Sequence, residues 1–240
     1  MTKGIRQGRK ERRFFYRALT VSLGILLLSE TVAANVLSSK IAQQPPATTS
    51  PSRNSEANNK GQKLLDEALE LLKQGTSQSR TNALAKYEQA LAIGQKIGDR
   101  AFVALALQGI GLTYLLGNNY PKALENYTQV LEIRRALGDR LYEAFALNAV
   151  AGIYSNLGEK QKAIDYYNQS LTLFRAEKKS TEIASTLISL GGVYENLGNT
   201  AKIIASYNQA LAIQRSTKDR AGVATTLANL GRVYTSLGEN

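Results

Sequence analysis

The 240-residue chain contains no histidine and no cysteine, which removes most catalytic chemistry at once. A Ser-His-Asp triad, a Cys-His dyad, a disulfide and the usual zinc sites all need one of these two residues. A phosphate-binding loop is also missing, because Gly111, Gly191 and Gly231 fall inside helical patterns rather than between a strand and a helix. The neighbouring Asp66 and Glu67 indicate a helix surface and imply no cleft for acid-base catalysis. We therefore predict no enzyme activity, no catalytic residues, no metal site and no cofactor.

Basic residues are concentrated near the N-terminus. Residues 1–60 hold ten basic and three acidic side chains, whereas residues 61–240 hold twenty and sixteen, so the net charge of +11 divides into +7 and +4. A nucleic-acid-binding domain needs clustered Lys and Arg, so the mixture of signs beyond residue 60 argues against a nucleic-acid partner. Pairs such as Arg134-Arg135 and Lys178-Lys179 are expected to lie on solvated helix faces.

Residues 1–34 have the layout of an export signal. A basic segment from Lys3 to Arg17 precedes an apolar segment, Ala18 to Leu28, and Val32-Ala33-Ala34 offers small residues for cleavage. We expect a cleaved signal that carries the chain across the inner membrane, making it periplasmic or secreted. The alternative is an inner-membrane anchor over residues 18–37, which reaches the roughly 20 residues of a membrane span only by including several polar side chains.

The basic segment also contains Arg12-Arg13 followed by two phenylalanines, which resembles a twin-arginine signal. Glu11 and Tyr16 depart from that pattern, so we interpret the two arginines as part of an ordinary basic segment.

Residues 35–61 are predicted to form a flexible linker. From Gln43 to Gly61 the chain is dominated by Pro, Ser, Thr, Asn and Gln with almost nothing apolar. Such a segment cannot bury enough apolar surface to offset the entropy lost on ordering. The folded domain is therefore expected at residues 62–240.

The folded domain repeats every 40 residues, a period typical of stacked copies of one supersecondary unit. We expect units at about 62–98, 99–138, 139–178 and 179–218, followed by a half unit at 219–240. Two tyrosine series, two leucine series and one alanine series carry the period: Tyr87, Tyr127, Tyr167 and Tyr207; Tyr114, Tyr154, Tyr194 and Tyr234; Leu91, Leu131, Leu171 and Leu211; Leu107, Leu147, Leu187 and Leu227; Ala104, Ala144, Ala184 and Ala224.

Each unit is predicted to contain two helices. In the second unit, one apolar face combines Leu107, Ile110, Gly111 and Tyr114, and after a break a second combines Ala123, Tyr127, Val130 and Leu131. Both tyrosine series are assigned to packing. The first unit is expected to be the least regular, with a first helix at about Gln62 to Gln74 and a loop from Gly75 to Arg80.

Turn residues separate the predicted helices. Gly98 with Asp99, and Gly138 with Asp139, suit a helix stop followed by an N-cap, and Ser180 is expected to cap where that pair is missing. Pro121 suits the first position of a helix, where a missing N–H costs nothing.

These residues resemble the tetratricopeptide repeat. Its features are a small Leu-Gly pair and a Tyr in the first helix, as at Leu190-Gly191 and Tyr194, and an Ala with an aromatic in the second, as at Ala163 and Tyr167. The period of 40 exceeds the usual 34 of this family, so the chain resembles the longer variant of kinesin light chains and many bacterial repeat proteins. The resemblance implies an all-α solenoid of stacked antiparallel helix pairs, about four and a half units long.

The resemblance also implies a binding site. In this family, a stripe of residues beside the packing face of each first helix lines a concave groove that holds an extended peptide. Asparagines are favoured candidates because an amide offers both a donor and an acceptor to a peptide backbone. For Leu112 and Leu115 the alternative is packing on the first unit, as apolar residues usually do. The candidate partner-binding residues are Gln108, Leu112, Leu115, Phe145, Asn148, Asn156, Asn196, Asn229 and Arg232.

The expected function is that of an exported, non-enzymatic scaffold whose concave groove binds a partner protein or peptide. One alternative is the N-terminal sensing arm of a longer repeat protein with a caspase-like protease domain, which bacterial proteins with such repeats often carry. Another is a membrane-anchored assembly factor.

The half unit at 219–240 keeps the apolar face of the complete units. It is expected to self-associate, to dock a partner or to continue into a longer array. The residues of that face are Leu227, Leu230, Val233, Tyr234 and Leu237.

Overall fold

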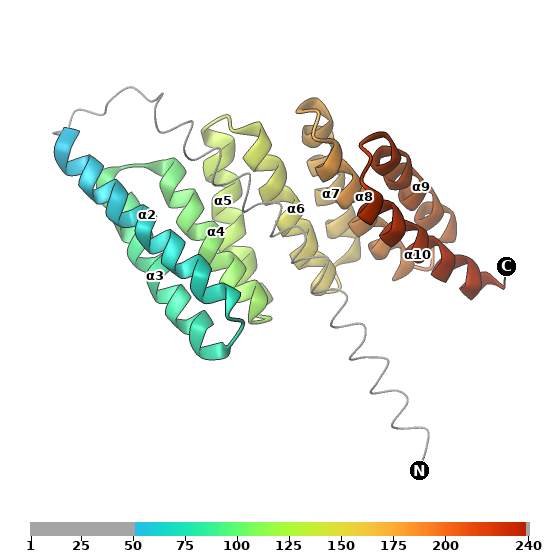
Figure 1. The fold of residues 1–240 in the computed structure, drawn as a ribbon, viewed down its shortest axis with the longest axis horizontal. Coiled ribbons are helices and arrows are strands. Elements are labelled where there is room, and N and C mark those ends of the chain that lie inside the picture. The colour runs from blue at the N-terminus through green and yellow to red at the C-terminus, as the bar shows by residue number, and fades with distance from the viewer. Residues whose placement is uncertain (1–50, 239–240) are drawn as a thin grey trace, which may run out of the picture. The chain divides into compact units, whose positions relative to one another are not determined.

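The computed structural model describes residues 51–238, with side chains from residue 56, and all regular structure in that range is α-helical (Figure 1). The predicted signal or anchor at 1–34 and the linker residues 35–50 lie outside the described residues. Within the described part, no helix is long and apolar enough to cross a membrane. The helices are α2 (Pro51–Lys73), α3 (Ser77–Ile97), α4 (Arg100–Leu116), α5 (Tyr120–Ala136), α6 (Arg140–Asn156), α7 (Lys160–Ala176), α8 (Ser180–Glu195), α9 (Thr200–Ser216) and α10 (Arg220–Leu237).

The helices pack as antiparallel pairs in chain order. The pairs α2–α3, α4–α5, α6–α7 and α8–α9 each form one unit, each pair packs on the next, and α10 packs on α9. First helices of neighbouring units also touch, as α2 does with α4 and α6 with α8. The prediction of an all-α solenoid of about four and a half units is confirmed.

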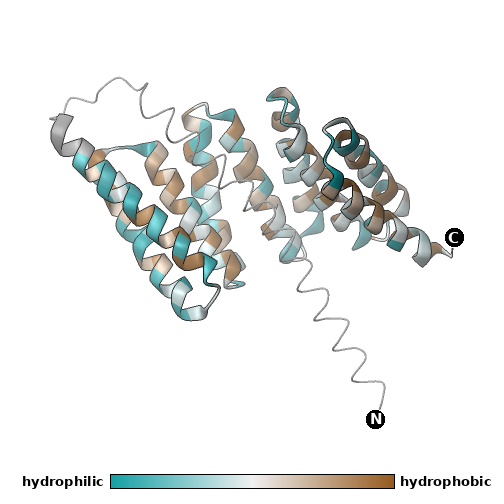
Figure 2. Cartoon of the chain, in the orientation of Figure 1, coloured by the Kyte–Doolittle hydropathy of each residue, from teal (hydrophilic) through white to brown (hydrophobic). Residues whose placement is uncertain are grey.

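The first unit differs from the prediction at the start of each of its two helices. Helix α2 begins at Pro51, so residues 51–61 are helical and the linker prediction is wrong there. Packing explains the difference: Gly61 is buried, and a Cβ on it would lie 2.7 Å from the Phe102 ring. The visible face of α2 is largely hydrophilic (Figure 2), which is why its composition resembled a linker.

The loop of the first unit is also shorter than expected. It spans only Gln74–Thr76, because Thr76 and Ser79 form a reciprocal capping box at the start of α3. The Ser79 amide donates to the Thr76 hydroxyl at 3.0 Å, and the Thr76 amide donates to the Ser79 hydroxyl at 3.1 Å. The sequence pattern was missed because Ser replaces the usual Glu or Gln of this motif.

The turns between units follow the predicted chemistry in part. Gly98 adopts the left-handed conformation with φ +74°, and the Asp99 carboxylate accepts from the Phe102 amide at 2.9 Å. Before α8, the prediction that Ser180 caps is wrong. Lys179 is the N-cap residue and Ser180 is the first residue of the helix, because Lys178 takes the left-handed conformation, with φ +53°.

The prediction that Pro121 is the first residue of a helix is also wrong by one position. It is the second residue of α5, and Asn119 caps that helix by accepting from the Lys122 amide at 3.3 Å.

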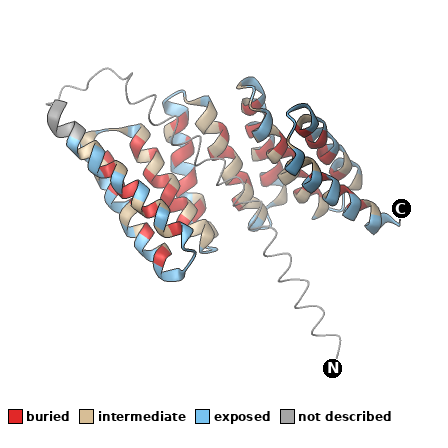
Figure 3. Ribbon diagram, in the orientation of Figure 1, coloured by how far each residue is buried: buried red, intermediate tan, exposed pale blue. Residues whose placement is uncertain are grey.

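Figure 3 shows buried residues along the helices of the units, and the second-helix tyrosines are among the buried residues. Tyr87, Tyr127, Tyr167 and Tyr207 are at most 6% exposed, so their assignment to packing is confirmed. Two rings lie where a first-helix glycine leaves room: a Cβ at Gly111 would be 2.9 Å from Tyr127, and one at Gly191 would be 2.5 Å from Tyr207. These glycines are therefore needed for close helix packing.

One buried position between units changes its residue in every unit. It holds Gly94, Arg134, Phe174 and Gln214, all buried. From the next unit, the Phe102 ring fills the space over Gly94 and the Thr226 hydroxyl donates to the Gln214 side chain at 2.8 Å, whereas the ring that meets Phe174 is that of Phe145 in its own unit. Since each junction is filled differently, the units are not interchangeable.

Arg134 corrects a prediction from the charge pattern. It was expected on a solvated face, but it is 3% exposed, with its Nη1 atom 3.2 Å from the Asp139 carboxylate. Arg135, Lys178 and Lys179 remain at least partly exposed, as predicted. Arg134 is buried because its position in the repeat is the one that faces the next unit.

Candidate protein-binding groove

The candidate binding surface runs along the first helices α4, α6, α8 and α10. Every residue of the predicted stripe is at least partly exposed, although the adjoining packing positions on α4, α6 and α8, such as Leu107, Leu147 and Leu187, are buried. We call these residues the groove stripe: Gln108, Leu112, Leu115, Asn148, Gly152, Ser155, Ile188, Gly192, Glu195, Ala228, Arg232 and Thr235.

The apolar start of the groove stripe is largely engaged in packing. Leu112 packs against the buried cluster of the first unit, as the alternative proposed. Leu115 instead packs against the cluster of Tyr127 and Val150, on α5 and α6. Both leucines keep part of their surface exposed, as does Gln108.

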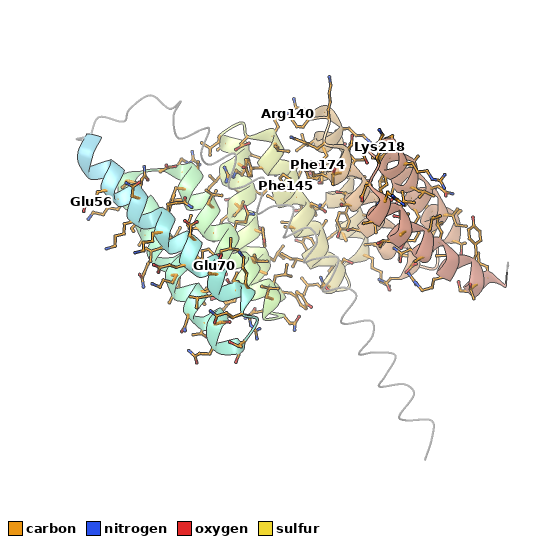
Figure 4. The ribbon with its side chains drawn as sticks, viewed as in Figure 1. Glu56, Glu70, Arg140, Phe145, Phe174 and Lys218 are labelled. Carbon is orange, nitrogen blue, oxygen red and sulfur yellow. The ribbon has the colours of Figure 1, made fainter. Side chains whose placement is uncertain are left out.

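Phe145 is held against the next helix of its own unit. Its ring meets Phe174 of α7 edge-on, with centroids 5.0 Å apart and planes at 73° (Figure 4). Phe174 is fully buried and Phe145 is partly exposed. The position of Phe145 is thus fixed by the core, and part of its surface stays exposed.

The middle of the groove stripe exposes backbone. A Cβ at Gly192 would meet no atom within 4 Å, and one at Gly152 would meet only the Tyr167 hydroxyl, at 3.5 Å. Beside them, the Asn148 side-chain amide donates to the Thr186 hydroxyl at 3.2 Å and so joins α6 to α8. A partner backbone can therefore approach closely over these two glycines.

The C-terminal end of the groove stripe carries an ion pair between units. The Arg232 Nη2 atom lies 2.8 Å from one oxygen of Glu195 and 3.1 Å from the other, which joins α10 to α8. The Tyr207 hydroxyl also donates to Glu195 at 3.4 Å. Arg232 is therefore already paired, and an acidic ligand would have to share it or displace Glu195.

The remaining asparagines lie at helix ends or beside the groove stripe. Asn156 ends α6 and donates to the Gly152 carbonyl at 2.8 Å, and Asn196 is the exposed C-cap of α8. Asn229 is partly exposed on α10. The structure thus brings Asn148 and Asn156 close to Gly152, and Asn196 next to Glu195.

Sequence reasoning missed a lysine series that covers the first-helix tyrosines. The Lys122, Lys162 and Lys202 ammonium groups lie 5.1, 5.2 and 5.1 Å from the ring centroids of Tyr114, Tyr154 and Tyr194. Cations at this distance are attracted by the ring quadrupole. The available signal was the spacing, since each lysine follows its tyrosine by the same interval and recurs with the same period.

The family model of the tetratricopeptide repeat matches residues 75–136, 119–176 and 182–240. The chain belongs to the tetratricopeptide repeat family. Domains of this family generally bind protein partners and are typically non-catalytic. No curated protein sequence matches the chain.

Several solved structures share the fold of these repeats. BtubC (BKLC) from P. vanneervenii has a TM-score of 0.63 at 22% identity, over 80% of this chain and 85% of that one. A putative kinesin light chain from Podospora anserina with nearly identical TPR-like repeats has a TM-score of 0.62 at 17% identity, over 74% and 88%. These two matches confirm the resemblance to kinesin-light-chain-like repeats.

A third structure is a signal transduction ATPase with numerous domains from Pyrococcus horikoshii, which has a tetratricopeptide repeat sensor. Its TM-score is 0.59 at 24% identity, over 67% of this chain and 25% of that one. At such identities the likeness shows the fold alone.

Proposed function

We propose that this tetratricopeptide repeat protein is a non-enzymatic scaffold that holds an extended segment of a partner protein along the groove stripe. The observation that carries the proposal is the open backbone at Gly152 and Gly192. At the same repeat position the second unit has Leu112, so a side chain fills this place there. The middle of the groove stripe is therefore the place where a peptide can lie closest to the helices.

The side chains around the two glycines suit an extended backbone. Asn148, Asn156 and Asn196 can each offer an amide to a passing peptide group, because an amide both donates and accepts. At one end of the groove stripe, Leu112 and Leu115 present partly exposed apolar surface. At the other end, Glu195 and Arg232 present both charges. The bound segment is then expected to combine an apolar end with a polar or charged one.

The test is partner capture by a triple variant in which Asn148, Asn196 and Arg232 are replaced by Ala. Capture should weaken by a few kcal/mol, because each hydrogen bond to a charged or buried polar group contributes roughly 0.5–3 kcal/mol. The matched control replaces Gln129, Gln169 and Gln209, exposed at one repeat position of the second helices, and should bind normally. Normal binding by the first triple variant, with binding lost in Leu112→Ala and Phe145→Ala chains that stay folded, would show that the apolar end carries recognition.

The proposed location is outside the cytoplasm, as a periplasmic or secreted protein. The basic and apolar segments of residues 1–34 support it, because they follow the layout of a cleaved export signal. The alternative, in which residues 18–37 remain in the inner membrane, makes the chain a membrane-anchored assembly factor. Sequencing of the mature N-terminus separates the two, since cleavage after Ala34 exposes Asn35.

A second candidate function is that of a sensing arm within a longer polypeptide, such as one with a caspase-like protease domain. The ATPase from Pyrococcus horikoshii favours it, because its repeats are a sensor within a chain much longer than the matched part. Reading the gene beyond the codon for Asn240 tests this candidate. A stop codon there would contradict it.

A further inference from the structure

Exposed basic residues recur with the repeat along one edge of the stack. Because the helices of each pair are antiparallel, every turn from a second helix to the next first helix lies on the same edge, where Figure 4 labels Arg140 and Lys218. Two repeat positions at this edge become basic along the chain: residues 95, 135, 175 and 215 are Gln, Arg, Arg and Arg, and residues 98, 138, 178 and 218 are Gly, Gly, Lys and Lys. We call the following residues the basic edge: Arg175, Lys178, Lys179, Arg215 and Lys218.

Two lysines of the basic edge hold a backbone conformation that favours glycine. The φ angles of Lys178 and Lys218 are +53° and +60°, and Gly98 and Gly138 occupy the same repeat position with φ +74° and +66°. A left-handed backbone brings Cβ close to the following carbonyl oxygen, so a lysine is less stable there than a glycine. Residues kept in such conformations are typical of functional sites. The two lysines therefore indicate a role for positive charge at these turns.

An earlier arginine of the same series is paired with a carboxylate of the chain itself. The Arg135 Nε atom lies 2.8 Å from the Glu143 carboxylate. The matching carboxylate is missing beside the next two arginines of the series, because the position of Glu143 holds Ile183 and Val223 in the following units. Among the residues that the structure describes, no member of the basic edge forms an ion pair. A charge that is neutralised in the second unit is thus left free in the next two.

The acidic residues nearest to these charges in the sequence have other partners. The Glu177 carboxylate lies 3.8 Å from the Arg140 Nε atom, and the Asp219 carboxylate accepts from the Gly222 amide at 2.8 Å.

The basic edge is open because of its place in the repeat. The same two repeat positions are exposed in the second unit, at Arg135 and Gly138, although two complete units follow there. A following unit therefore leaves these positions uncovered, and their exposure does not depend on where the sequence stops.

The basic edge has no exposed large apolar side chain. In the described part of the chain, such side chains are exposed elsewhere, at Leu137, Leu157, Leu197, Leu227 and Leu237. Binding to a membrane surface usually combines cations with apolar side chains, and binding to single-stranded nucleic acid combines them with aromatic rings. The composition of the basic edge favours a partner that is recognised by charge alone.

Two of these exposed leucines belong to the half unit. Leu227 and Leu237 are 45% and 44% exposed, as expected for an uncovered face, whereas the expectation is wrong for Leu230 and Val233, which are buried against α9. A second helix covers the equivalent Leu187 of α8, and a further one would cover Leu227 in the same way. The open residues of α10 therefore identify no partner.

We propose that the basic edge binds an acidic segment of a partner protein, whose Asp and Glu side chains pair with Arg175, Arg215 and the lysines beside them. The chain provides the model for this contact in the pair of Arg135 and Glu143. Guanidinium and carboxylate groups form charge-assisted hydrogen bonds, which are stronger than neutral ones. Neighbouring helices pack roughly 8–10 Å apart, so an extended segment of about ten residues, about 33 Å long, can pass over both turns. This surface is separate from the groove stripe and does not rest on the proposed function.

The test measures the binding of a labelled decaglutamate peptide to the full chain by fluorescence anisotropy. Binding should be saturable at low salt and should weaken as salt is added, because the charges are exposed. The variant that combines Lys178→Gly, Arg215→Gln and Lys218→Gly should bind about tenfold more weakly, or roughly twofold for each exposed pair removed. No binding by the native chain, or equal binding by this variant, would overturn the proposal.

The three substitutions are chosen so that unfolding cannot explain the loss. Each one introduces the residue that the first unit has at that position, Gln95 or Gly98. Since glycine suits the left-handed conformation, the variant should have a higher melting temperature than the native chain.

The matched control removes three exposed charges from the opposite edge of the stack, by Lys122→Gln, Lys162→Gln and Lys202→Gln. This control should bind decaglutamate as the native chain does. Equal weakening in both triple variants would overturn the proposal, because binding would then follow net charge alone. So would a loss confined to other anionic probes, namely vesicles of phosphatidylcholine and phosphatidylglycerol in equal parts, or labelled oligothymidine.

Discussion

Arg134 and Tyr142 form a cation–π contact inside the stack of repeats, with the guanidinium carbon 4.5 Å from the ring centroid. The Arg134 Nη1 atom also meets the Asp139 carboxylate at 3.2 Å, while its Nε atom is buried without a hydrogen-bond partner. Burial lowers the pKa of Arg134, and Asp139 with Tyr142 acts against that shift. One carboxylate and one ring thus hold a positive charge in the interior.

Removal of the carboxylate is therefore expected to destabilise the chain. Asp139→Asn should lower the free energy of unfolding by about 3 kcal/mol, the lower end of the range for a broken buried pair, because Asp139 is not fully buried. The matched control is Asp99→Asn at the preceding unit. Asp99 caps α4 through the Phe102 amide, a role that Asn fills about equally well, so this change should cost little. Urea unfolding of both variants checks the prediction, and equal losses would contradict it.

Replacement of Arg134 itself should reduce the stability of the chain far less than replacement of Asp139. Arg134→Met removes the charge and fills a similar volume, and such exchanges of buried ion pairs are often neutral or stabilising. The double variant Arg134→Met with Asp139→Asn should then regain most of the stability that Asp139→Asn loses. A double-mutant cycle measures this coupling. Additive losses would show that Arg134 and Asp139 do not act as a pair.

Equivalent glycines in neighbouring units should respond with opposite signs. Gly191→Ala forces a Cβ to within 2.5 Å of the Tyr207 ring, so it should destabilise by about 1–3 kcal/mol. Gly231→Ala enters open space in a helix interior and should stabilise by about 0.5–1 kcal/mol. Thermal unfolding of the two variants gives the signs directly. A loss of stability in Gly231→Ala would mean that the side of α10 bearing Gly231 is already covered.

The buried tyrosines should make the fold sensitive to alkaline pH. Burial raises the pKa of Tyr167 from 10.0 to about 12, and it raises those of Tyr87, Tyr127 and Tyr207 as well. Since the folded pKa lies above the unfolded one, the stabilisation is fully present below pH 10 and is lost as pH rises toward 12. Each such tyrosine should contribute a loss of up to about 1.4 kcal/mol per pH unit in that window.

Urea unfolding at several alkaline pH values measures this slope. Tyr167→Phe should reduce this slope by the contribution of about one proton, because a phenylalanine side chain has no ionisable hydroxyl. An unchanged slope in this variant would show that Tyr167 titrates normally in the folded chain.

The repeat could be derived from the sequence because packing positions recur with their residue types. The spacing of Tyr127, Tyr167 and Tyr207 fixed the unit length, and their burial confirms it. The start of α2 could not be derived, because a polar composition indicates a linker unless a partner such as Phe102 packs on Gly61. Periodicity identifies the packing positions that the units share, but it does not predict contacts that occur in one unit only.

The same reasoning predicted the candidate site only in outline. The register predicted which residues of α6, α8 and α10 are exposed, since these positions lie beside the packing face. It did not predict that Arg232 pairs with Glu195 or that Asn148 bonds Thr186. These contacts join different units and depend on how far one helix is displaced along the next, which the sequence of a single unit does not contain.

The proposed location can be checked with a C-terminal reporter that fluoresces only in the cytoplasm. If the signal in residues 1–34 directs export of the unfolded chain, the reporter should stay dark and the N-terminus should be cut. A chain from which residues 1–34 are deleted is the control and should fluoresce. A fluorescent full-length fusion with an uncut N-terminus would contradict export.

Site-specific photocrosslinking tests the central claim, that the groove stripe is the partner-binding surface, most directly. A photoreactive side chain at position 192 stands in open space in the middle of the groove stripe, and the same group at position 209 stands on the exposed side of α9. In living cells, the account predicts a discrete crosslinked protein from position 192 and none from position 209. Equal crosslinking from both positions, or adducts from position 209 alone, would contradict it.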